Sequence, residues 1–258
     1  RTLTPQMPER CAWRGCGTLW LAETPQELEI AREKQRRMAA YQVSSEMQTP
    51  SQLTQREPLL RAGLQGGLWV PGDGIVYAPE VARWFIADAG DNLTCLSEGA
   101  TEIAEPAVTL TCGKQLRAPA IVVACGLGAN GLLGENWLRA KKGQLAISDR
   151  YGPLLHHQLV ELGYGASAHG GGTSVAFNVQ PRPTGQLLIG SSRQFDNSER
   201  QLDLPLLAQM LDRARHFLPA LAGLNIIRCW SGFRAASEDG NPLIGPHPTR
   251  PGLWLALG

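Results

Sequence analysis

Residues 229–246 read CWSGFRAASEDGNPLIGP and combine an apolar segment, an arginine and a turn. The apolar segment, residues 224–230, is predicted to be a strand that leads into Gly232, Arg234 and an Asp-Gly-Asn-Pro turn. This sequence places the cation of Arg234 at a strand end, beside a glycine that lets another group approach the backbone closely. A guanidinium can donate two parallel hydrogen bonds, so Arg234 is suited to bind a carboxylate. The alternative is a hairpin in which Arg234 pairs with Glu238 or Asp239, because most charges at turns are solvated.

The run W-x-G-x-R-x-x-S-x-D-G-x-P-x-I-G in residues 230–245 resembles the C-terminal pattern of the FAD-dependent D-amino acid oxidase/dehydrogenase family, which includes the glycine and sarcosine oxidases. That family usually has proline after the arginine, whereas this chain has Ala235. The resemblance implies FAD as the cofactor and Arg234 as the residue that holds the substrate carboxylate above the flavin. It also implies that Ala100, Gly232 and Gly258 contact the cofactor.

A second stretch allows two interpretations. Residues 120–124 (AIVVA) predict a strand of a sheet buried on both faces. Residues 126–131 (GLGANG) then match G-x-G-x-x-G, and Asp149 follows at about the 20-residue spacing of a dinucleotide-binding fold. Glycines and Asn136 weaken the helix that should follow. On this interpretation the chain would be an NAD(P)-binding protein.

The other interpretation comes from the family. Residues 122–128 (VVACGLG) resemble its V-V-x-A-(T/S)-G-A-W pattern, where a late strand passes close to the FAD. The resemblance assigns Ala124, Cys125 and Gly126 to the cofactor, with Cys125 replacing the usual hydroxyl. The family's own G-x-G-x-x-G unit is then expected upstream of Arg1, and its last flavin-binding turn after Gly258. The chain is therefore interpreted as part of a longer protein. Residues 142–144 (KGQ) and 181–190 (PRPTGQLLIG) also resemble family patterns.

Composition narrows the functional classes. The chain has 258 residues and a formal charge of +1, with Lys and Arg scattered along it, so a broad nucleic-acid footprint is not expected. No apolar run approaches the roughly 20 residues of a membrane span, and residues 1–10 are polar rather than a signal peptide. The six cysteines are expected to be buried and reduced, with a Cys11–Cys16 disulfide or metal pair as the alternative, and no metal site is expected. The expected location is the cytoplasm, with peripheral association with the inner membrane as an alternative.

Caps and apolar spacing predict helices and strands along the whole chain. Helices are predicted at residues 25–44, 51–60, 78–89 and 204–217. Strands are predicted at residues 17–22, 64–70, 93–96, 100–104, 120–124, 142–148, 174–179, 186–191 and 224–230, with a hairpin over 108–116. The resemblance implies an α/β fold of mixed α+β kind. It divides the chain into a discontinuous Rossmann-like FAD domain (65–138 and 226–258) and an antiparallel-sheet substrate domain (1–64 and 139–225).

The resemblance implies that an amino acid or secondary amine gives a hydride to the flavin, leaving an imine that hydrolyses. The predicted substrate is a small-molecule D-amino acid or cyclic secondary amino acid, and the electron acceptor is oxygen or an electron-transfer partner. Pocket residues are expected on the antiparallel sheet, namely His169, Phe177, Asn178 and Arg182. The glycines of residues 170–172 are either a mobile loop over the pocket or a hairpin turn. An alternative function is a non-catalytic subunit that only assembles with partner subunits.

Overall fold

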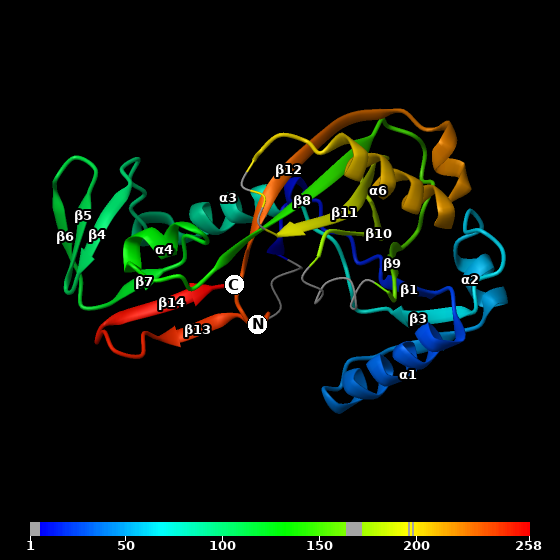
Figure 1. Cartoon of the computed structure of the whole chain (residues 1–258), viewed down its shortest axis with the longest axis horizontal. Coiled ribbons are helices and arrows are strands. Elements are labelled where there is room, and N and C mark those ends of the chain that lie inside the picture. Colours follow the sequence, from blue (N-terminus) through cyan, green and yellow to red (C-terminus); the bar gives the residue numbers. More distant parts are fainter. Residues whose placement is uncertain (1–5, 164–171, 196, 198) are drawn as a thin grey trace. The chain divides into compact units, whose positions relative to one another are not determined.

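The computed structural model describes residues 6–163, 172–195, 197 and 199–258, and Figure 1 draws its elements along the chain. The chain divides into two compact units. Unit 1 contains the described residues of 1–90, 144–193 and 201–231, whereas unit 2 contains those of 91–143, 194–200 and 232–258. The mixed α/β class predicted from the sequence is confirmed.

Among the residues that the structure describes, eight strands form one large sheet. They are β1 (Thr18–Ala22), β2 (Glu46–Gln48), β3 (Gly66–Val70), β8 (Arg139–Ser148), β9 (Gln158–Glu161), β10 (Ser174–Pro181), β11 (Leu187–Phe195) and β12 (Ile226–Ala236). Their order is β12-β8-β11-β10-β9-β1-β3-β2. β10 runs antiparallel to β9 and β11, and β1 runs antiparallel to β3 but parallel to β9. Strands β8 and β12 each contain residues of both units.

The α-helices described in unit 1 are α1 (Pro25–Ala40), α2 (Pro50–Arg56), α3 (Ala78–Ala89) and α6 (Leu204–Phe217), with the 3-10 turns η2 (Glu9–Cys11) and η4 (Pro219–Gly223). Three of these α-helices, α1, α2 and α6, begin where a side chain accepts a hydrogen bond from a backbone amide of the first turn. Thr24 accepts a hydrogen bond from the amide of Glu27, and Asp203 accepts one from Leu206. Each α-helix has proline in its first turn, where a backbone donor is not needed. The predicted bounds of α3 and α6 are confirmed.

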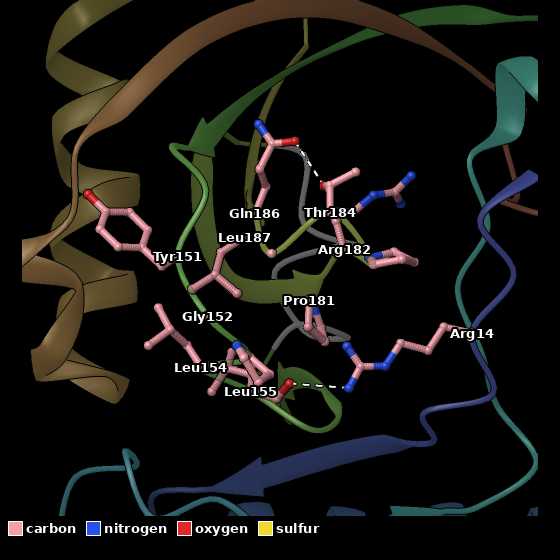
Figure 2. Close-up of a pocket in the computed structure, with 13 residues that line it drawn as sticks. Arg14, Tyr151, Gly152, Leu154, Leu155, Pro181, Arg182, Thr184, Gln186 and Leu187 are labelled. Atoms are coloured by element: carbon pink, nitrogen blue, oxygen red, sulfur yellow. Dashed lines mark hydrogen bonds between the residues drawn. The ribbon is translucent and has the colours of Figure 1, made fainter. Parts of the chain in front are cut away.

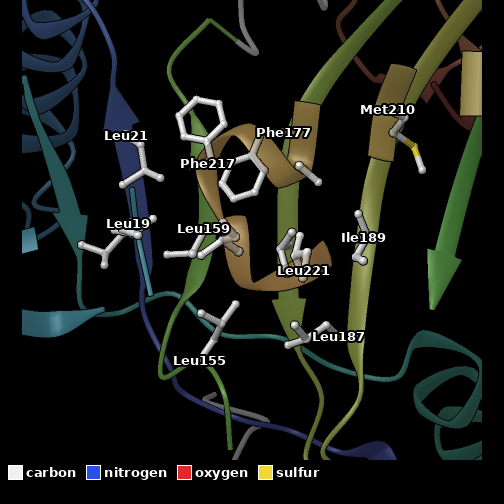
Figure 3. Close-up of a cluster of buried hydrophobic side chains, with 14 of the residues drawn as sticks. Leu19, Leu21, Leu155, Leu159, Phe177, Leu187, Ile189, Met210, Phe217 and Leu221 are labelled. Atoms are coloured by element: carbon white, nitrogen blue, oxygen red, sulfur yellow. The ribbon is translucent and has the colours of Figure 1, made fainter. Parts of the chain in front are cut away.

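The core of unit 1 lies between the sheet and the apolar side of α6 (Figure 3). Leu159, Val179 and Ile189 are in register on neighbouring strands, so their side chains share the face that α6 covers. Phe177 and Phe217 stack with ring centroids 4.4 Å apart, and both are fully buried. The amphipathic pattern of residues 204–217 is therefore satisfied by the sheet.

A cluster of charges lies beside this core in unit 1. Arg213 of α6 contacts the carboxylates of both Glu23 and Glu161. Arg61 donates to Glu23 at 2.6 Å, and His216 contacts the same carboxylate. Burial alone raises the pKa of Glu23, but hydrogen bonds from Arg61, His216 and Arg213 outweigh it and leave that pKa below its ordinary value of 4.5. The charges are thus held as a mutually compensating group.

Unit 2 contains two small sheets and a short helix. Its elements are β4 (Ala100–Ala104), β5 (Ala107–Leu110), β6 (Gln115–Arg117), β7 (Ile121–Val123), α4 (Gly128–Leu133), β13 (Leu243–Pro246) and β14 (Leu253–Leu257), and the 3-10 turn η3 (Gly90–Asn92) links the units. β4, β5 and β6 form an antiparallel sheet. In the other sheet β14 is antiparallel to β13 and parallel to β7. Leu253 and Leu255 pack with Ile121 and Val123 on one face of that sheet.

Several local predictions are wrong. Residues 93–96 are irregular chain, and both Leu93 and Leu96 are exposed, so this apolar run pairs with no described strand. The strand at 120–124 is not buried on both faces, because Val122 is 62% exposed while Ile121 and Val123 are buried.

Two helices are shorter than predicted. α1 ends at Ala40 rather than residue 44, and Gln42 has a left-handed backbone (φ 58°) that a helix does not tolerate. α2 ends at Arg56 rather than residue 60. The next residue, Glu57, turns its carboxylate inward and accepts hydrogen bonds from the backbone amides of His156 and His157.

The segment boundaries also differ from the predicted domain boundaries. Residues 65–90 group with unit 1, because β3 lies between β1 and β2 in the large sheet. Unit 2 begins at residue 91 and again includes residues 139–143 and 194–200. The assignment of a cofactor role to one set of segments and a substrate role to the other stays a prediction.

The cysteines do not match the expected pattern of burial. All six are free, which excludes the Cys11–Cys16 disulfide in this structure. Cys11 is buried, but Cys95, Cys112 and Cys125 are exposed. Among the described residues no three His, Cys, Asp or Glu side chains gather into a group that could hold a metal ion. A search of the same residues for a helix both long and apolar enough to cross a membrane finds none.

Candidate functional site

Arg234 lies near the end of β12, on a strand that neighbours β8 in the large sheet. The side chain is exposed, and its guanidinium rests against the backbone of Gly143 in β8. A Cβ added at Gly143 would stand 2.7 Å from Nη1 of Arg234 and 3.1 Å from Cζ and Nη2. Only glycine therefore leaves the guanidinium its present place without a shift. Both residues belong to unit 2.

The turn after β12 is closed by its own side chains. Asp239 accepts hydrogen bonds from the backbone amide of Asn241 at 2.9 Å and from its side-chain amide at 3.0 Å. These hydrogen bonds hold the pKa of Asp239 below its ordinary value. Ser237 donates to the carbonyl of Asn241 at 2.7 Å. The turn therefore closes through Asn241, and the hairpin alternative, in which Arg234 pairs with Glu238 or Asp239, stays a prediction.

A second group of predicted residues lies at one edge of the β13-β14-β7 sheet. β7 and β14 are parallel, with Leu255 opposite Val123, so their carboxyl ends reach the same edge. Ala124, Cys125 and Gly126 follow β7 there, and Gly258 follows β14. In open α/β sheets, ligands bind outside the carboxyl ends of the strands. The structure therefore brings these four predicted residues to one edge of unit 2.

Few side chains cover the backbone at this edge of the sheet. Ala124 and Cys125 are exposed, and Gly126 has a left-handed backbone (φ 57°) with Cβ of Ala235 in β12 as its nearest neighbour, 3.8 Å from an added Cβ. Gly232 is also exposed, and an added Cβ there would meet nothing within 4 Å. Small or absent side chains let a planar group approach the backbone closely. Exposed backbone amides can donate to a flavin ring and carbonyls can accept from it, so residues at this edge fit the isoalloxazine part of FAD.

The literal G-x-G-x-x-G at residues 126–131 opens only a six-residue helix. α4 ends at Leu133, and Gly134 takes a left-handed backbone (φ 71°) that stops it. Asn130 then joins the following segment, because its side chain donates to the carbonyl of Leu138 at 2.8 Å and accepts from its amide at 3.1 Å. The weakness of this helix, predicted from its glycines, is confirmed.

Ala100 lies elsewhere in unit 2. It is the first residue of β4, is exposed and pairs with Leu110 of β5. The structure thus pairs Ala100 with the antiparallel sheet rather than with residues 124–126, and its cofactor role stays a prediction.

Arg182 lines an open cavity of about 420 Å³ in unit 1 (Figure 2). It comes from the hairpin between β10 and β11, and its Nη1 donates to the carbonyl of Val76 at 3.1 Å. Burial lowers the pKa of the Arg182 guanidinium, and Tyr77 opposes the shift. A second arginine, Arg14, lines the same cavity and donates through Nη2 to the carbonyl of His156 at 3.2 Å.

The other predicted pocket residues are not grouped with Arg182. Phe177 is fully buried in the unit 1 core against Phe217, so the structure corrects its assignment to a pocket wall. Asn178 is half-buried in β10, opposite Gly190 of β11 and Val160 of β9. His169 and residues 170 and 171 lie outside the described residues.

Two residues that the structure places beside predicted site residues were not predicted from the sequence. Gly143 belongs to the KGQ run, but its closeness to Arg234 depends on the pairing of two strands distant in sequence. Arg14 precedes β1 and carries no pattern of its own. Its cavity partners come from residues 151–155 and 181–187, which only the fold brings to it.

Comparison with known proteins supports the same family as the sequence patterns. The glycine oxidase of Geobacillus kaustophilus (strain HTA426) is 30% identical over 224 residues, which cover 81% of this chain and 55% of that protein. The chain thus spans about half the length of this relative. The crystal structure of glycine oxidase from Geobacillus kaustophilus superposes with a TM-score of 0.84 at 25% identity, covering 99% of this chain and 70% of that one.

A more distant structure shares the fold. The L-proline dehydrogenase from P. horikoshii matches with a TM-score of 0.84 at 18% identity, covering 95% of this chain and 67% of that one. Residues 2–258 match the family described as FAD dependent oxidoreductase (DAO), which covers almost the whole chain. The chain belongs to the FAD dependent oxidoreductase (DAO) family, and FAD is the cofactor of that family.

Proposed function

We propose that the protein oxidises the C–N bond of a small amino acid, either glycine-like, of D-configuration or a cyclic secondary amine, with FAD as the acceptor. The observation that carries the proposal is Arg234, whose guanidinium lies against the bare backbone of Gly143 in a chain of the DAO family. The similarity to glycine oxidase and to an L-proline dehydrogenase supports a small amino acid as the substrate class.

The residues at the carboxyl edge of β7 and β14 would hold the cofactor. Ala124 and Cys125 are exposed there, Gly126 is half-buried, and Gly258 lies at the end of the neighbouring strand. Gly232, two residues before Arg234, presents a further open stretch of backbone. Bound FAD supplies the two-electron acceptor for oxidation of a C–N bond.

Arg234 is proposed to act by positioning. Its planar fork would donate two parallel hydrogen bonds to the oxygens of the substrate carboxylate, which fixes the α-carbon and its hydrogen in one orientation. Because the guanidinium rests against Gly143, part of its freedom is already lost before the substrate arrives, and less side-chain entropy is lost on binding. The oxidised product would be an imine that takes up water: an open-chain imine releases ammonia or an amine and leaves an oxo acid, whereas a cyclic imine opens to an amino-oxo acid.

The test is anaerobic reduction of the flavin in the purified full-length protein. The absorbance of the bound flavin is followed after addition of glycine, sarcosine, D-alanine, or the D and L forms of proline and hydroxyproline. We expect at least one of these compounds to bleach the flavin, and Arg234→Ala to retain the flavin but bleach far more slowly. A flavin-loaded protein that no amine in the panel reduces would contradict the proposal. Air-oxidation of the reduced protein then distinguishes oxygen from an electron carrier as the acceptor.

A further inference from the structure

The cavity around Arg14 and Arg182 is lined by residues of unit 1 alone. Arg234 belongs to unit 2. Its volume of about 420 Å³ lies within the range of small-molecule sites, roughly 300–1,000 Å³. Its lining includes two arginines and no Asp or Glu.

Backbone carbonyls hold the Arg14 guanidinium in place and use only one of its nitrogen atoms. Its Nη2 donates to the backbone carbonyls of His156 at 3.2 Å and Leu155 at 3.4 Å, and no ion pair forms between Arg14 and a described carboxylate. Figure 2 shows the guanidinium reaching toward Leu155 and lying beside Pro181. Because the backbone fixes one side of the guanidinium, its remaining N–H groups are preorganised to meet an anion.

Arg182 adds a second positive charge in the same cavity. Its contacts are the carbonyl of Val76 and the ring of Tyr77, 5.6 Å from the guanidinium carbon, so no described carboxylate neutralises it. Burial of a charge without a partner costs free energy, which an arriving anion would offset. In Figure 2 Arg182 extends to a different side of the cavity from Arg14. It therefore makes the electrostatic potential in the cavity more positive but does not bind the same carboxylate together with Arg14.

The remaining walls are largely apolar. Leucine and proline side chains surround the arginines, namely Leu154, Leu155, Leu187, Pro153, Pro181 and Pro183. Such a surface gains free energy by covering an apolar ligand body, which a bare inorganic ion lacks. The combination fits an anion that carries a short hydrocarbon chain.

We propose that this cavity of unit 1 binds a small organic carboxylate. The carboxylate would meet the unused donors of Arg14, and the hydrocarbon part would lie against the leucine and proline walls. The inference does not depend on the proposed function, because it uses unit 1 alone.

Binding can be measured by NMR titration of the purified protein with butyrate, and with its neutral analogue butyramide. We expect butyrate to bind saturably and butyramide at least tenfold more weakly. Arg14→Gln should weaken butyrate at least tenfold, and Arg182→Gln about threefold. Arg36→Gln, an exposed arginine paired with Glu33 on α1, should have no effect. Equal affinity for butyrate and butyramide would overturn the proposal, as would tighter binding of inorganic phosphate.

A second variant keeps both arginines and blocks the space. Gly152 lines the cavity, and an added Cβ there meets nothing within 4 Å, so Gly152→Phe can enter the cavity without a clash at the backbone. It should abolish butyrate binding, whereas Gly72→Phe, at an equally open glycine outside the cavity, should not. Unchanged binding in Gly152→Phe would refute the assignment. Arg234→Ala should retain butyrate binding, and its loss there would place the butyrate at the substrate site instead.

Discussion

Arg213 in unit 1 and Arg234 in unit 2 show how differently one residue type is used. Arg213 contacts two carboxylates, and one of them, Glu161, is only 4% exposed. Arg234 is exposed on β12 and rests on the backbone of a glycine. The first environment stabilises the fold by compensating buried charge, and the second keeps a planar cation at the protein surface. The surroundings of an arginine, rather than the residue type, therefore indicate its role.

The largest effect that we expect is a loss of catalytic activity when Arg234, but not Arg213, is substituted. Arg234→Ala should lower kcat/KM for the substrate amino acid by about 10²–10³-fold, or about 3–4 kcal/mol, because the carboxylate loses its charged partner. The free energy of unfolding should change by less than about 1 kcal/mol, because the side chain is exposed. Steady-state kinetics and denaturant unfolding measure both. Arg228→Ala, at another exposed arginine of β12, is the control, and an equal loss of activity there would remove the special role of Arg234.

The reverse result is expected for the buried charges. Arg213→Met should lower the free energy of unfolding by about 3 kcal/mol, because it leaves Glu161 buried without its cation. The kcat/KM of the folded protein should change far less than in Arg234→Ala. Arg215→Met serves as the matched control, since Arg215 pairs with the exposed Asp212 one turn along α6. If both variants unfold at the same denaturant concentration, the buried cluster does not stabilise unit 1.

Gly143→Ala tests whether the glycine positions Arg234. The added Cβ would displace the guanidinium, whose flexible stem permits the shift, so we expect KM to rise about tenfold with a smaller change in kcat. Thermal unfolding should be nearly unchanged. Gly131→Ala, where an added Cβ meets nothing within 4 Å, should leave KM unaltered. An unaltered KM in Gly143→Ala as well would show that the contact with Arg234 has no role in binding.

The smallest expected effect is a pH dependence of stability. Since the pKa of Glu23 is lowered in the folded protein, the unfolded chain binds more protons between the folded pKa and 4.5. Its contribution to stability is therefore complete above pH 4.5 and is lost as the pH falls through the folded pKa. Glu23→Gln should flatten the acid limb of a plot of unfolding free energy against pH. Parallel acid limbs in the two proteins would assign the pH dependence to other groups.

Local sequence patterns correctly predicted the elements whose first and last residues are marked by the sequence itself. Helices α3 and α6 were predicted at their observed bounds, because proline in the first turn and an amphipathic pattern define them. The strand predicted at 93–96 failed because an apolar run becomes a strand only when another strand pairs with it. The exposure of Val122 could not be predicted from the residues of its strand, because burial depends on which other elements cover the sheet.

The candidate-site residues that lie within a recognisable sequence pattern could be predicted from the sequence. Arg234 and residues 124–126 came from family patterns, and the structure places the latter at a sheet edge typical of ligand sites. Gly143 and Arg14 were not predicted, because their roles arise from contacts between segments distant in sequence. Phe177 was assigned to a pocket from its place in a strand, but the alternation of that strand turns it into the core.

The most direct test of the central claim compares a substrate with its amide. For whichever amino acid reduces the flavin, kcat/KM is measured for the acid and for the corresponding carboxamide, in the wild-type protein and in Arg234→Ala. If Arg234 binds the carboxylate, the wild type should prefer the acid by about 10²-fold or more, and the variant should have lost most of that preference. If the variant keeps the full preference, another group recognises the carboxylate and the role assigned to Arg234 is wrong.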